Sequence, residues 1–242
     1  IGGIQPDSPA RVLGDRHQSA AAPGAAFARS PFDSVPLDEQ FDPSHPQPVT
    51  DLQRQALRIT SRDPQPPPAA YLAGSGGMFK DMTIHDFDMA RYLAGSEVVE
   101  VYTAAGVMVD PAIGAAGDVD TAMITLRFTN GAIGTIDNSR QAVYGYDQRV
   151  EVFGSKGMVA VANNTPDTHV YSTADGVHSA KPLYFFLERY RVAYAAEMAH
   201  FFDALGKGTP VRTSIDDGVK ALELAEAATA SWRERRIVEL PA

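Results

Sequence analysis

The chain has 242 residues, of which 44% are hydrophobic, so it can bury the core of one domain or one and a half. Its 30 acidic residues outnumber its 21 basic ones and give a net charge of -9, which argues against a nucleic-acid-binding surface. The lack of cysteine excludes disulfides and zinc–thiolate sites. There is no apolar run of roughly 20 residues and no signal peptide pattern, so we expect a soluble, cytoplasmic protein without a membrane segment.

The N-terminal part is predicted to be irregular. Residues 1–56 are rich in Ala, Pro, Gly and Arg and show no strand or helix period, apart from one short helix expected near 51–56. Such a segment buries too little apolar surface to offset the entropy lost on ordering. We therefore expect an irregular or degenerate arm over residues 1–40 and a folded domain over residues 41–242.

The remaining sequence predicts strands joined by short turns, followed by helices. Asn130-Gly131 and the segment 154–157 are typical of hairpin turns, and Gly95 is a candidate helix C-cap. The predicted strands cover 57–61, 98–105, 121–128, 132–139, 148–153, 158–162, 169–172 and 237–240, and the predicted helices cover 78–93, 187–205 and 215–233. We expect an α+β fold, in which helices cover one face of an open, mainly antiparallel sheet of about six strands.

The densest polar cluster falls on the predicted helix over 78–93. In a continuous helix, Asp81 and His85 would be i, i+4 neighbours on one face, with Asp88 one turn further. A carboxylate one turn from an imidazole can hold its tautomer, which suits a general base that accepts an alcohol proton. The same spacing also fits a surface or capping network, or a Zn or Fe site built from His85, Asp81 and Asp88. No further metal ligand lies at an obvious spacing in the sequence, so no metal is expected.

Two further clusters are candidates for ligand binding. Tyr144 and Tyr146 follow the predicted strand 132–139, where tyrosine hydroxyls can bind a polyhydroxylated molecule. Arg62 lies before a proline-rich segment and can reach a ligand or pair with a carboxylate such as Asp63. An ordinary loop with edge tyrosines and a local ion pair explains the same residues.

Several of these segments, in order along the chain, resemble the inositol 2-dehydrogenases of the glucose–fructose oxidoreductase (Gfo/Idh/MocA) family. The similarity is carried by TSRDP at 60–64, GGMFKDMTIHDFDMAR at 76–91, GDVDT at 117–121, IDNSR at 136–140, YGYDQR at 144–149, VFGSKG at 152–157 and FFLERY at 185–190. It covers about residues 57–242, and FDPSH at 41–45 resembles the start of the family's C-terminal domain.

The resemblance implies an enzyme that oxidises a ring hydroxyl of myo-inositol, or of a related polyol or sugar, and passes the hydride to NAD. The family's D-x-x-x-H motif falls on Asp81 and His85, so His85 would accept the hydroxyl proton and Asp81 would orient it and contact substrate. Tyr146, and after it Tyr144, would lie near the polyol, and Arg62 is a further candidate contact. The family also implies a place in inositol catabolism and pairing of subunits through the open sheet, commonly into homotetramers.

The family's nucleotide-binding half has no counterpart in the sequence. A Rossmann domain carries G-x-G-x-x-G after its first strand, and neither Gly2-Gly3 nor the segment 74–77 supplies that pattern. We therefore expect the N-terminal Rossmann domain to be missing, and no cofactor-binding residue is assigned. The alternative function is a non-catalytic domain that binds polyols or only oligomerises.

Overall fold

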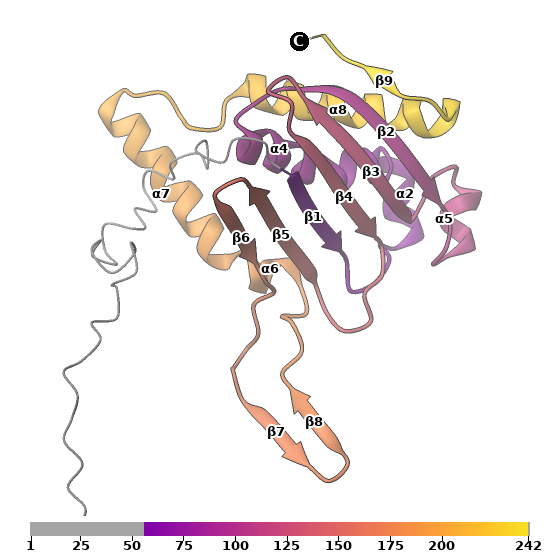
Figure 1. The fold of residues 1–242 in the computed structure, drawn as a ribbon, viewed down its shortest axis with the longest axis vertical. Coiled ribbons are helices and arrows are strands. Elements are labelled where there is room, and N and C mark those ends of the chain that lie inside the picture. Colours follow the sequence, from indigo (N-terminus) through magenta and orange to yellow (C-terminus); the bar gives the residue numbers. More distant parts are fainter. Residues whose placement is uncertain (1–55, 242) are drawn as a thin grey trace, which may run out of the picture. The chain divides into compact units, whose positions relative to one another are not determined.

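The computed structural model describes residues 56–241, so the predicted arm over 1–40 and the short helix near 51–56 lie outside the described residues. Nine strands are found within this range. They are β1 (Ala56–Arg62), β2 (Val98–Gly106), β3 (Thr121–Phe128), β4 (Ile133–Ser139), β5 (Asp147–Gly154), β6 (Gly157–Val161), β7 (Val170–Thr173), β8 (Gly176–Ser179) and β9 (Val238–Glu239). Seven of them form one sheet in the order β6-β5-β1-β4-β3-β2-β9, and β7 and β8 form a separate hairpin (Figure 1).

The main sheet is antiparallel except at its centre, where β1 runs parallel to β4. The two predicted turns connect neighbouring strands. Gly131 takes a positive φ of 85° between β3 and β4, and Gly154 pairs with Gly157 across the β5–β6 turn. The mainly antiparallel sheet is therefore confirmed, with seven strands in place of about six.

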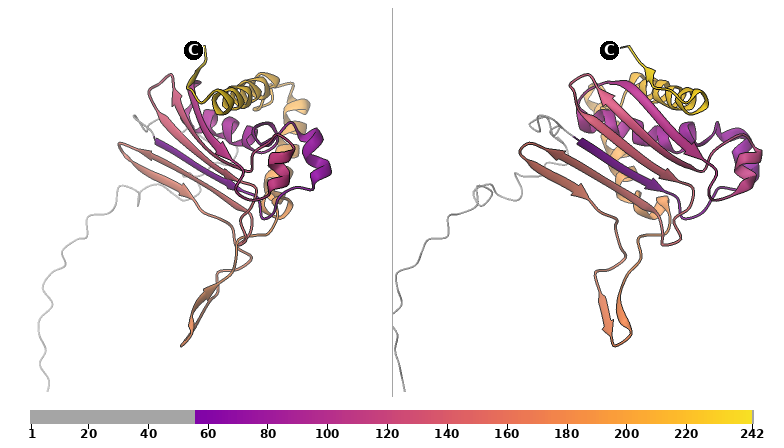
Figure 2. Two further views of the ribbon diagram at one scale, coloured as in Figure 1. Left: turned by 90° about the vertical axis from the view of Figure 1, so that its right-hand side faces the viewer. Right: turned by 45° about the vertical axis from the view of Figure 1, so that its right-hand side comes forward.

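Helices cover one face of this sheet. The described helices are α2 (Ala69–Ser75), α3 (Met78–Asp81), α4 (Thr83–Ala94), α5 (Pro111–Ala115), α6 (Phe186–Arg189), α7 (Arg191–Lys207) and α8 (Ile215–Glu234). Figure 2 shows α4 and α8 lying against the same side of the strands. The core between the layers contains Phe87 of α4, Val101 of β2, Ile124 of β3 and Ala228 of α8, all at most 1% exposed. None of the described helices is long and apolar enough to cross a membrane.

The strands alternate between the two faces. Leu57, Ile59 and Ser61 of β1 point to the helices and are buried, whereas Arg58, Thr60 and Arg62 point to the other side. We call the side without helices the open face. Its exposed apolar side chains are Tyr102, Met123, Ile133 and Phe153.

Two predicted helices are each divided in the structure. The expected helix over 78–93 is α3 and α4, because Met82, with φ -111° and ψ -59°, interrupts the helix between them. Its predicted cap at Gly95 is confirmed by a left-handed φ of 57° and N–H contacts to Arg91 and Tyr92. The expected helix over 187–205 is α6 and α7, and Ala204 is the buried residue of α7.

Candidate active site

The segment that carries Asp81 is a single helical turn held from outside. α3 has four residues, too few to be stable alone, and its N-terminus needs acceptors for free N–H groups. Both carboxylate oxygens of Asp118 accept from the N–H of Met78, at 3.0 and 3.1 Å. Gly77 has φ of 86°, and a Cβ there would lie 3.0 Å from Asp118, so glycine suits this close approach.

The Asp81 carboxylate is bound on both oxygens by other residues of the chain. The Tyr71 hydroxyl donates to Oδ1. The Arg140 guanidinium lies on the other side, with Nη2 2.7 Å from Oδ2. The N–H groups of Nη2 do not point at Oδ2, so this contact is an ion pair and not a hydrogen bond. Arg140 also reaches Asp63, with 3.4 Å between Nη1 and Oδ2.

His85 lies in the first turn of α4, and its side chain is exposed. Within the described residues, Asp81 makes no hydrogen bond or ion pair with His85, and its orienting role stays a prediction. The helix is interrupted at Met82, and the hydrogen bonds and ion pairs of Asp81 within the described residues go to Tyr71 and Arg140. His85 therefore presents an exposed imidazole, with the Asp88 carboxylate near enough to interact with it electrostatically.

A buried polar cluster lies behind this turn. Asn138 of β4 has no exposed surface, donates from Nδ2 to Oδ2 of Asp86 at 2.7 Å, and accepts at Oδ1 from the Thr83 hydroxyl at 2.7 Å. Burial raises the pKa of Asp86 to about 7, although the hydrogen bond from Asn138 and the neighbouring Ser61 hydroxyl oppose the shift. The cluster ties α4 to the strands beneath it.

Tyr146 lies near the same buried polar cluster, since the charge of Asp86 acts on its hydroxyl. Its ring meets that of Tyr190 edge-on, with 6.0 Å between centroids. The Tyr190 hydroxyl donates to Oε1 of Gln148 at 3.3 Å, and Ser61 donates to the same oxygen at 2.7 Å. Burial is the main cause that raises the pKa of the Tyr146 hydroxyl, and Asp63 and Asp86 contribute through their charges. Tyr146 therefore stays a neutral hydroxyl that can donate or accept.

Arg62 and Tyr144 form a different cluster on the open face. Arg62 ion-pairs with Asp137, and its Nη1 lies 3.2 Å from the Tyr144 hydroxyl. Tyr144 in turn donates to Oδ2 of Asp147. Strand alternation places Arg62 opposite to Ser61, on the face away from the helices. The structure thus groups Tyr146 with Asp63 and Asp86, and places Arg62 and Tyr144 on the other face of the sheet.

Sequence reasoning missed several residues that build the site. Asp63 was weighed only as an ion-pair partner of Arg62, and Tyr71, Asp118 and Arg140 were given no role, although Asp118 and Arg140 lie in quoted motifs. Their roles depend on contacts between residues 10 to 77 positions apart, which no local pattern signals.

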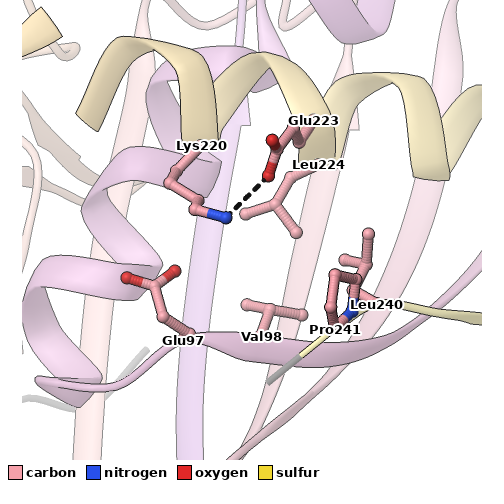
Figure 3. A pocket seen from close by; sticks show the side chains of 7 residues that line it. All are labelled: Glu97, Val98, Lys220, Glu223, Leu224, Leu240 and Pro241. Atoms are coloured by element: carbon pink, nitrogen blue, oxygen red, sulfur yellow. Dashed lines mark hydrogen bonds and ion pairs between the residues drawn. The ribbon is translucent and has the colours of Figure 1, made fainter. Parts of the chain in front are cut away.

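The pockets of the described part lie elsewhere. A hollow of about 20 Å³, the size of one water molecule, is lined by Glu97, Val98, Lys220, Glu223, Leu224, Leu240 and Pro241 (Figure 3). The lining residues make the hollow a seam between α8 and the start of β2. Lys220 and Glu223, both on α8, form an ion pair there at 2.9 Å. Within residues 56–241, no three His, Asp or Glu side chains are placed to hold a metal ion.

The described residues do not fit a dinucleotide. A Rossmann site needs a glycine-rich turn between a strand and a helix of a parallel βαβ unit. Gly76 and Gly77 lie between two helices, α2 and α3. The parallel pair β1–β4 has β2 and β3 between its strands in the chain. No residue of this part is therefore assigned to NAD.

Fold and site together define an α+β domain with a polar cluster around Asp81 at the end of its sheet. The GFO/IDH/MocA C-terminal domain model matches residues 54–160. Residues 54–160 thus match the C-terminal domain of this family.

Several of the relatives it matches are named as inositol dehydrogenases. It is 55% identical to myo-inositol 2-dehydrogenase of Thermotoga maritima over 76% of this chain and 55% of that protein. It is 49% identical to inositol 2-dehydrogenase of Rhizobium meliloti over 77% of this chain and 56% of that one. The crystal structure of a myo-inositol dehydrogenase from Corynebacterium glutamicum superposes with a TM-score of 0.76 at 44% identity, over 80% of this chain and 58% of that one. The chain thus spans about half the length of the relatives it matches.

Proposed function

We propose that the chain is the polyol-binding half of an NAD-dependent inositol 2-dehydrogenase, an enzyme that oxidises a ring hydroxyl of myo-inositol or a related polyol to a ketone. The observation that carries the proposal is the Asp81 carboxylate, held in place by Tyr71 and Arg140 just before the helix whose first turn exposes the His85 imidazole. The 55% identity to a myo-inositol 2-dehydrogenase over this domain supports the same substrate class.

His85, Asp81 and Tyr146 have different proposed roles, which follow from their chemistry. His85 accepts the proton of the reacting hydroxyl, because imidazole is the side chain that exchanges protons near neutral pH. Asp81 accepts hydrogen bonds from neighbouring hydroxyls, since each of its oxygens keeps a lone pair beyond those used by Tyr71 and Arg140. Tyr146 supplies a neutral hydroxyl to the ring. Arg62 and Tyr144 stay predicted substrate contacts, and their position on the open face favours a role at a subunit interface.

NAD belongs to the proposal only for the complete enzyme. When bound, it would accept the hydride from the carbinol carbon. Since the described residues do not fit a dinucleotide, a second candidate function is a polyol-binding domain without redox activity. The two candidates share the same polyol site and differ in whether NADH is formed.

Binding of myo-inositol to the purified chain tests the site. Ligand-observed NMR should detect binding by the wild type and at least about tenfold weaker binding by Asp81→Asn and His85→Ala, because each removes a group that meets hydroxyls. The control is Lys220→Ala in the seam of Figure 3, which should bind like the wild type. Equal binding by all variants would remove Asp81 and His85 from the site.

NADH formation from NAD and myo-inositol tests whether the chain alone is a complete enzyme. The chain alone should form none, as the described residues hold no nucleotide site. Turnover by the chain alone would show that a nucleotide site is completed by other residues or by a second subunit.

We also propose that the open face pairs with the open face of another copy, in assemblies of up to four subunits. The support is the exposure of Met123 and Phe153, each at 54%, and of Ile133 at 50%, on a side of the sheet that carries no helix.

A further inference from the structure

The carboxylate of Asp81 is held by one buried side chain, that of Arg140. Arg140 directly follows β4 and is 3% exposed. Its N–H donates to the carbonyl of Asp120 at 2.8 Å, and Asp120 itself accepts from the N–H groups of Met108 and Val109. These hydrogen bonds therefore fix the backbone of Arg140 at the end of the sheet, independently of the contacts of its side chain.

The guanidinium lies between two carboxylates from different segments. It is 2.7 Å from Asp81 and 3.4 Å from Asp63. Burial is the main cause that raises the pKa of Asp63, and the charge of Arg140 opposes it. Without Arg140, two partly buried carboxylates would be left without their cation, and each would turn toward solvent.

The other supports of Asp81 are weaker. α3 is a single turn, and its cap by Asp118 fixes the start of the helix, three residues before Asp81. Tyr71 is 51% exposed, so its hydrogen bond competes with water. The rigid, water-excluded contact is the one with Arg140.

We infer that Arg140 is a positioning residue of the polyol site: it does not touch the substrate, and it orients the Asp81 carboxylate from behind. The inference rests on the proposed function. The buried guanidinium holds two carboxylates through two separate nitrogens, 2.7 Å from Asp81 and 3.4 Å from Asp63, whereas a lysine supplies a single point charge. The orientation of Asp81 then decides which ring hydroxyls it can accept from, so Arg140 controls the preference between inositol epimers.

The test compares Arg140→Lys and Arg140→Met with the wild-type chain. We expect myo-inositol to bind about tenfold more weakly or worse to both, with the ratio of myo- to scyllo-inositol affinities changed, because a carboxylate misplaced by about 1 Å loses directional hydrogen bonds. A crystal structure of Arg140→Lys should show the Asp81 carboxylate rotated away from its wild-type position. Arg140→Lys keeps the charge and is the variant expected to fold if Arg140→Met does not.

Arg91→Met is the matched control. Arg91 lies on α4, the helix of His85, is 11% exposed, and forms ion pairs with Glu97 at 2.7 Å and Asp217 at 3.5 Å. Its loss should lower stability and leave the epimer ratio unchanged. If Arg140 only stabilised the fold, its variants would likewise lower stability and leave the epimer ratio unchanged.

The outcomes distinguish a failure of the positioning role of Arg140 from a failure of the proposed function. An unchanged epimer ratio in folded Arg140→Lys, or an unmoved Asp81 in its crystal structure, overturns the positioning role. If the wild type binds neither inositol, the proposed function fails, and the crystal structure of Arg140→Lys alone decides whether Arg140 positions Asp81.

Discussion

Two aspartates of the motif 81–86 have different chemistry because their surroundings differ. Asp81 is bound by a cation and a phenol at the edge of the sheet. Asp86 lies on the buried side of α4, 5% exposed, where its neighbours are the neutral Asn138 and Ser61. A buried carboxyl without a cation favours its protonated form. The motif thus supplies one group for recognition and one for the core.

The raised pKa of Asp86 predicts a fall in stability as pH rises. With a pKa of about 7 in the folded state and 3.8 as its ordinary value, the folded protein holds this proton more tightly than the unfolded chain. The contribution is full below pH 4 and is lost as pH rises through 7. It amounts to roughly 4 kcal/mol as an upper figure.

Asp86→Asn removes the titrating group and keeps its shape. We expect the free energy of unfolding to lose this slope between pH 4 and 7, and the variant to be more stable than the wild type at pH 8, by urea denaturation. Asp175→Asn, on the exposed β7–β8 turn, is the control and should keep the slope because Asp86 is intact in it. A slope that survives in Asp86→Asn would assign the pH dependence to other groups.

At the scale of elements, the helices end and begin where a backbone group finds a partner. α8 starts at a capping box, in which the Ser214 hydroxyl accepts from the N–H of Asp217, and the Asp217 carboxylate accepts from the N–H of Ser214 at 2.8 Å. Asp217 also meets Arg91, so the cap joins α8 to α4. The layer that covers the sheet is thereby fixed at its N-terminal end.

Ser214→Ala should lower the free energy of unfolding by about 1 kcal/mol, because the N–H of Asp217 loses its acceptor. Urea denaturation measures the change. Ser155→Ala in the exposed β5–β6 turn is the control, expected to stay within about 0.5 kcal/mol of the wild type. Equal stability of both variants would show that water replaces the cap at no cost.

At the scale of the whole described domain, one face of the sheet is packed and the other is not. The helices bury Leu57, Ile124 and Val152 on their side. The open face combines apolar side chains with the ion pairs of Arg62 and Arg58. An apolar and charged surface of this kind is typical of a face that meets another protein surface.

The double variant Tyr102→Glu/Met123→Glu tests pairing through the open face. Light scattering coupled to gel filtration should show an oligomer for the wild type and a smaller species for the variant, since buried charges at a paired face are costly. Met108→Glu, 77% exposed on the loop after β2, is the control and should keep the wild-type mass. A monomeric wild type would contradict pairing.

Most of the elements followed from local patterns. The strand over 121–128 was predicted with its correct ends, because its residues alternate, and the structure buries Ala122, Ile124, Leu126 and Phe128. The helices α2 and α5 and the strand β8 were missed. They are four to seven residues long, and too short to establish a period.

The sequence by itself determined the order of the strands along the chain, the hairpin turns and the residue types of the site, because these depend on neighbours a few positions apart. The tertiary structure decided which of those residues meet. It brought Arg140 to Asp81 across 59 positions, broke the helix between Asp81 and His85, and put Arg62 and Tyr144 on the open face. Contacts between distant segments depend on strand pairing and layer packing, and a local pattern carries no information about either.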